Sequence, residues 1–166
     1  MRLRFARDVN GNAARRGMTV FDTQTQAVLQ EVFRREGRSF LLYTHDSFPW
    51  TTSEEEPALE RLQKLIESER DAWSALGRFL LRNRVMLPVL GTYPVNFTSF
   101  NFQSLDSLVP KLLTAEKQLL ADLERDLPGV HDPAARAHLT KLADLKRQHV
   151  KELGGLLSAV PQTASA

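Results

Sequence analysis

Cysteine is absent from this chain of 166 residues, which excludes disulfide bonds, cysteine-ligated zinc, iron–sulfur clusters and thiol catalysis. The sequence also lacks a glycine-rich phosphate-binding loop and the nucleophile elbow of serine hydrolases. No stretch approaches the roughly 18 apolar residues that a membrane-spanning helix needs. We therefore expect a soluble protein without membrane partners, most simply a cytoplasmic one.

Charge of either sign is in little excess, with 22 basic and 20 acidic side chains and a formal net charge of +2. Residues 1–19 hold five arginines against one aspartate, a local charge of +4 that leaves −2 for the remainder. A nucleic-acid-binding domain usually carries a strongly basic face, so we expect no nucleic-acid partner. We predict that residues 1–18 form a basic N-terminal arm or a small hairpin, and that residues 161–166 form a disordered tail.

Apolar residues make up 42% of the chain, which is enough for the core of one domain. They recur every three or four positions in four segments, as they do on one face of an α-helix. These segments cover about residues 21–43, 57–87, 104–127 and 133–156. The pattern predicts an all-α four-helix bundle over residues 19–160.

The connections between the four segments are short, long and short. Short links favour antiparallel neighbours, so the first two helices form one pair and the last two form another. The long connection, residues 88–104, can run the length of a bundle when extended. It carries four aromatic residues and no Lys or Arg, which favours packing along the bundle over stacking on nucleic-acid bases. We predict a long central crossover here.

Each apolar stripe contains one polar residue near its middle, namely Glu36, Glu69, Glu116 and His149. Glu36 and Glu69 lie roughly 14 and 18 Å along their helices from the link that joins them, and Glu116 and His149 roughly 17 and 24 Å from theirs. Buried carboxylates are usually paired or bound to a metal ion. Taken singly, each glutamate is equally consistent with a position at the border of its stripe, in contact with solvent.

The helix order and these four residues resemble the ferritin-like superfamily. That family places two iron or manganese ions at mid-bundle, between a Glu on one helix of each pair and a Glu-x-x-His motif on the other. Glu36 and Glu116 stand at the positions of the single glutamates. Glu69 stands at the Glu of the first motif, but Ala72 occupies its His position. The resemblance therefore implies a site that has lost one nitrogen ligand.

The second motif is also incomplete, because His149 matches its His while Lys146 occupies its Glu position. The remaining set of Glu69, Glu116 and His149, supported by Glu36, suits a single iron, manganese or zinc ion. Alternatively, no metal binds, and Lys146 replaces the metal charge by pairing with Glu36 or Glu69. The direction of the Lys146 side chain distinguishes the two: an inward lysine compensates the carboxylates and argues against catalysis, whereas an outward lysine leaves them in need of another cation.

The resemblance implies an iron-handling or oxidoreductase role, and we expect the protein to form a homodimer. The competing hypothesis is a metal-free structural or interaction bundle, which would act on a protein partner through its surfaces. The sequence names no substrate, and it leaves open whether the protein is an enzyme.

Overall fold

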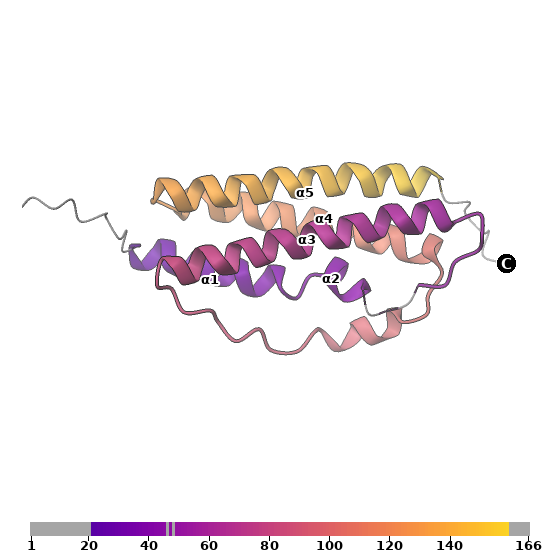
Figure 1. Ribbon diagram of the computed structural model, residues 1–166, viewed down its shortest axis with the longest axis horizontal. Helices are drawn as coiled ribbons and strands as arrows, with labels where there is room; N and C mark the ends of the chain where they lie inside the picture. The colour runs from indigo at the N-terminus through magenta and orange to yellow at the C-terminus, as the bar shows by residue number, and fades with distance from the viewer. Residues whose placement is uncertain (1–20, 46, 48, 160–166) are drawn as a thin grey trace, which may run out of the picture.

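The computed structural model describes residues 21–45, 47 and 49–159, and the predicted all-α class is confirmed over this part of the chain (Figure 1). The described residues form five α-helices and two short 3₁₀ helices. The helices are α1 Thr23–Glu36, α2 Phe40–Thr44, α3 Glu56–Arg82, η1 Val95–Phe100, α4 Leu105–Asp126, η2 Leu127–Gly129 and α5 Pro133–Ala159. The predicted arm at 1–18 and tail at 161–166 lie outside the described residues. None of the described helices is both long and apolar enough to cross a membrane.

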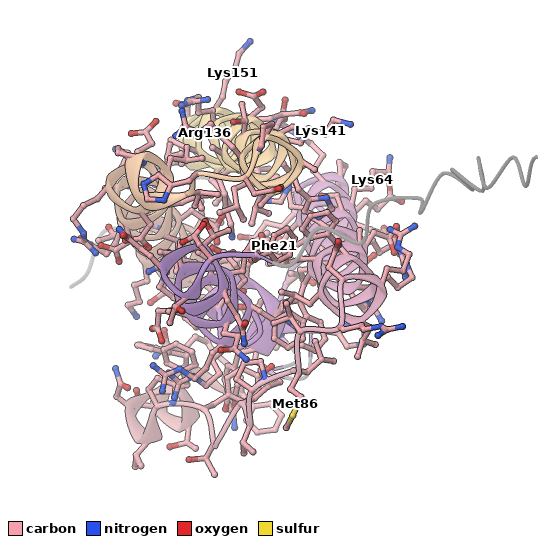
Figure 2. The ribbon with its side chains drawn as sticks, turned by 90° about the vertical axis from the view of Figure 1, so that its left-hand side faces the viewer. Phe21, Lys64, Met86, Arg136, Lys141 and Lys151 are labelled. Atoms are coloured by element: carbon pink, nitrogen blue, oxygen red, sulfur yellow. The ribbon has the colours of Figure 1, made fainter. Side chains whose placement is uncertain are left out.

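The long helices lie side by side, and the connection after α3 returns along the outside of the bundle to the start of α4 (Figure 1). This connection packs through its aromatic residues: the rings of Phe97 and Phe100 lie 4.9 and 4.6 Å from that of Phe40 in α2. A view along the bundle places Lys64, Lys141 and Lys151 on the outside (Figure 2). The long connection is thus ordered against the bundle by apolar contacts.

One expectation was wrong: the predicted helix over 21–43 is two helices with a break between them. α1 ends at Glu36, and the Ser39 side chain caps α2 by accepting a hydrogen bond from the Leu42 amide at 3.1 Å. The break coincides with a close approach of two elements, because Gly37 packs on the indole of Trp73 in α3. A Cβ at position 37 would lie 2.8–3.0 Å from that ring, so only glycine fits there without movement.

We expect Gly37→Ala to destabilise the protein by about 1–3 kcal/mol, the usual cost of overpacking a core. The ring cannot yield easily, because Trp73 Nε1 donates a hydrogen bond to the Phe33 carbonyl at 3.0 Å. The matched control is Gly154→Ala in α5, where a new Cβ meets no atom within 4 Å and helix propensity favours alanine. Urea denaturation would measure both; equal stability of the two variants would refute the packing argument.

The apolar core consists of two clusters on either side of one polar layer. The first cluster includes Leu29, Val32, Leu76, Leu80, Leu123 and Leu139. The second includes Phe40, Leu62, Ile66, Leu105, Leu112 and Leu153. Along α4, for example, the buried Glu116 stands between Leu112 of the second cluster and Leu123 of the first. The buried polar residues of the long helices therefore meet in one layer near the middle of the bundle.

Candidate metal centre

Five ionisable side chains from four helices meet in the polar layer. They are Glu36 of α1, Glu69 of α3, Glu116 of α4, and Lys146 and His149 of α5, and each is at most 2% exposed. All four residues that the sequence marked at mid-helix lie in this cluster, together with Lys146. Ligand atoms of Glu69, Glu116 and His149 lie within 4.8 Å of one another, whereas Glu36 joins the cluster through Lys146.

The Lys146 ammonium lies at the centre of the three carboxylates. Its Nζ is 2.8 Å from Glu36 Oε2, 2.6 Å from Glu69 Oε1 and 3.1 Å from Glu116 Oε2. A lysine one turn and a half earlier, Lys141, and one later, Lys151, both point to solvent (Figure 2). The inward direction of Lys146 is the one that compensates the carboxylates. Its contact with Glu116 was not predicted from the sequence.

The imidazole of His149 links the layer to α3 through both ring nitrogens. Nδ1 lies 3.2 Å from Glu69 Oε2 and 3.6 Å from Glu116 Oε2, and Nε2 lies 2.7 Å from Ser68 Oγ. The Ser68 hydroxyl donates its single hydrogen to the Leu65 carbonyl at 2.9 Å. Ser68 must therefore accept from His149, which fixes a hydrogen on Nε2. With a hydrogen on Nε2, the nitrogen facing the carboxylates, Nδ1, carries a lone pair in the neutral ring and a hydrogen in the protonated ring.

Glu69 Oε2 and His149 Nδ1 face each other in the layer, 3.2 Å apart. A protonated His149 pairs with the carboxylate across this distance, whereas the neutral ring with its hydrogen on Nε2 leaves both atoms without a hydrogen bond among the described residues. Glu69 Oε1, by contrast, accepts a hydrogen bond from Lys146 Nζ. Leaving buried polar atoms unsatisfied costs free energy, so such a pair marks a place where a further partner would bind.

Burial and the neighbouring charges move the pKa values in the layer in opposite directions. Burial raises the pKa of Glu36 to about 7 against the pull of the Lys146 ammonium. Burial would also raise the pKa of Glu69, but Lys146 and His149 outweigh it and lower that pKa to about 2. For His149, burial favours the neutral ring, but its contacts with Glu116 and Glu69 outweigh burial and raise the pKa.

Burial also acts against the charged form of Lys146 and would lower its pKa. The three carboxylates outweigh this effect, so the pKa of Lys146 is raised and the ammonium stays charged. The formal charge of the layer then depends on two protons. With Glu36 and His149 both protonated, two carboxylates face two cations and the sum is zero. With neither protonated, three carboxylates face one ammonium, and the sum of −2 matches one divalent cation.

A surface hollow of about 300 Å³ reaches the layer from the side, between α3 and α5. Ser68 and His149 line its inner end, and Arg61, Lys64 and Glu152 line its rim. Arg61 and Glu152 are joined by an ion pair of 2.9 Å. The hollow touches the polar layer at His149, and Glu69, Glu116 and Lys146 do not line it.

The comparisons with known proteins leave the family open. No protein-family model, no curated protein and no solved structure matches the chain. No family is assigned. The structure supports an all-helical protein with a buried Glu–Glu–His cluster that could hold a metal ion and that also contacts Lys146.

Proposed function

We propose that the protein is a ferritin-like bundle that binds a single divalent transition-metal ion through Glu69, Glu116 and His149, with Lys146 in place of a second metal ion. The observation that carries the proposal is that the two carboxylate oxygens of Glu69 face different partners. One carboxylate oxygen lies 2.6 Å from the Lys146 ammonium, and the other lies 3.2 Å from the His149 imidazole nitrogen. A carboxylate that bridges two cations presents one oxygen to each in the same way.

The spacing of the donor atoms fits one shared ion. Two ligands each about 2.1 Å from a metal ion lie about 3.0–3.4 Å apart in octahedral or tetrahedral geometry. His149 Nδ1 lies 3.2 Å from Glu69 Oε2 and 3.6 Å from Glu116 Oε2, and an ion would draw the three ligand atoms together from separations of up to 4.8 Å.

The donor set also defines the class of metal. Two carboxylates and one imidazole suit Fe(II), Mn(II) or Zn(II). Ser68 contributes by holding the hydrogen on His149 Nε2, which directs the Nδ1 lone pair toward the two glutamates. A bound iron or manganese ion would supply one-electron redox chemistry, and a zinc ion would supply Lewis acidity. The proposed role is accordingly the handling of such an ion, because the inward Lys146 compensates the carboxylates and argues against catalysis.

Metal content tests the proposal directly. We expect the full-length protein, incubated anaerobically with Fe(II), Mn(II) or Zn(II) and desalted, to retain about one ion per chain by mass spectrometry. The double variant Glu69→Gln/His149→Gln should retain none. The control is His138→Gln, which changes another α5 histidine that stacks on Phe79 outside the polar layer. It should keep the ion.

A graded variant separates binding from folding. Ser68→Ala should keep the stoichiometry but weaken metal affinity about 10- to 100-fold, as removal of partners behind a ligating histidine usually does. Ser158→Ala, which removes an exposed hydroxyl from α5, should leave the affinity unchanged.

The second candidate function is a metal-independent structural or interaction bundle. The position of Lys146 favours it, since one ammonium lies within 3.3 Å of all three glutamates. Folded wild-type protein that retains no metal ion, and whose melting temperature no metal ion changes, would establish this candidate instead of the metal site. The predicted homodimer would then be the first surface interaction to measure.

A further inference from the structure

A groove lies on the opposite side of α3 from the hollow beside His149, between α3, the α1–α2 break and the start of the long connection. It consists of two adjoining hollows of about 350 and 240 Å³ that share His45, Ile66 and Arg70. We call it the arginine groove. Each hollow is near the lower end of the range of small-molecule sites, about 300–1,000 Å³.

The charges in the smaller hollow have one sign. Arg38, Arg70 and His45 line it, and no carboxylate does among the described residues. Neither guanidinium forms an ion pair or a side-chain hydrogen bond with any residue of the described ranges. Arg35, three residues before Arg38, shows the contrast because it lies 2.9 Å from Asp126. Two arginines from different elements thus line a hollow in which the described residues include no carboxylate.

Arg38 carries the stronger signal of the two. Its Nε is buried and, like the Nε of Arg35, has no hydrogen-bond partner in the described part of the chain. A buried donor without a partner is costly, and a guanidinium is shaped to donate two parallel hydrogen bonds to a carboxylate. Arg38 lies at the break between α1 and α2, and its side chain lines both the smaller hollow and a further hollow beside Phe40 and Phe97.

Apolar side chains form part of the remaining walls, beside Thr44 and Gln63 in the larger hollow. Trp73, Leu90 and Ile66 line the smaller hollow, and Leu59, Leu62 and Ile66 line the larger one. Glu67 lines only the larger hollow, so an anionic group is favoured at the Arg38 end and disfavoured at the other. The groove therefore pairs a cationic end with an apolar body.

We propose that the arginine groove binds a small amphipathic organic anion. Its carboxylate pairs with Arg38 and Arg70, and its apolar body lies over Ile66 toward the larger hollow. The site is separate from the polar layer and does not depend on a metal ion.

Octanoate is a suitable probe. 1-Octanol has the same apolar chain without the charge, and acetate has the carboxylate without the long apolar chain. Trp73 reports binding if Trp50, the other tryptophan of the chain, is replaced by Phe; Trp50 is 64% exposed and lines neither hollow. In metal-free full-length Trp50→Phe protein, octanoate should change the fluorescence in a saturable manner. Octanol and acetate should bind at least tenfold more weakly.

Variants of the arginines complete the test. Arg38→Gln should weaken octanoate binding at least tenfold, and Arg70→Gln should do so too if Arg38→Gln fails to fold by circular dichroism. Arg78→Gln, an exposed arginine of α3 outside the groove, should bind as the parent does. The proposal is overturned if nothing binds saturably, if octanol binds as tightly as octanoate, or if the folded groove variants bind like the parent.

Discussion

Lys146→Met will lower the free energy of unfolding by about 3–5 kcal/mol at pH 7, the usual effect of removing one partner from a buried ion-pair network. The side chain keeps similar length and apolar volume, so the loss reports the ammonium and not a cavity. Without it, three carboxylates at most 2% exposed would face one another with His149 as their remaining cationic partner in the layer. Urea denaturation of the metal-free protein would measure this effect.

A control variant and a metal-rescue experiment accompany the Lys146→Met variant. Lys151→Met changes a lysine that points to solvent, and we expect a change within about 0.5 kcal/mol (Figure 2). A divalent ion should restore much of the stability of Lys146→Met, because the ion supplies the charge that the ammonium supplied. A Lys146→Met protein as stable as the wild type would show that the network contributes little net stability.

The metal-free protein will be most stable near pH 5 and will lose stability as the pH rises toward 8. The Glu36 carboxyl has a pKa of about 7 in the folded state, above its unfolded value of 4.5, so the folded state holds the proton more tightly. Its contribution is complete below pH 4.5 and is lost as the pH rises through 7. The loss is about 3 kcal/mol, and the raised pKa of His149 adds a loss of the same sign above pH 6.5.

On the acid side of the profile, the free energy of unfolding falls as the pH is lowered. The pKa of Glu69 falls to about 2 on folding, so its contribution is present above pH 4.5 and disappears as the pH falls through 2. Glu36→Gln isolates the alkaline side because an amide cannot ionise. Between pH 5 and 8 its stability should fall less steeply than that of the wild type. Parallel profiles for the two proteins would mean that Glu36 does not titrate in this range.

The composition of the polar layer followed from the sequence because it obeys a local rule. A polar residue in the middle of an apolar helical stripe lies either in the core or at the border of the stripe, and Glu69, between Ile66 and Leu76, lies in the core. Similar distances from a short link then bring two such residues together. Lys146 was identified in a different way, from the resemblance, because it occupies the Glu position of the second Glu-x-x-His motif.

Features that depend on contacts between distant segments could not be predicted in this way. The break after α1 depends on the indole of Trp73, which is 36 positions away from Gly37 in the chain. The contact between Ser68 and His149 joins residues 81 positions apart, and the helical spacing of apolar residues gives no sign of it. The arginine groove likewise exists only where the α1–α2 break meets α3. In each of these places, tertiary packing overrides the local pattern.

The polar layer between two apolar clusters also fixes how the helices are staggered. Leucine layers alone would tolerate a shift of one helix along its neighbours, since one leucine can replace another after a turn of about 5.4 Å. Such a shift would move Glu116 among leucines and leave Lys146 facing apolar side chains, at a cost of several kcal/mol. The polar layer thus fixes a single register of the helices along one another, whether or not a metal ion is bound.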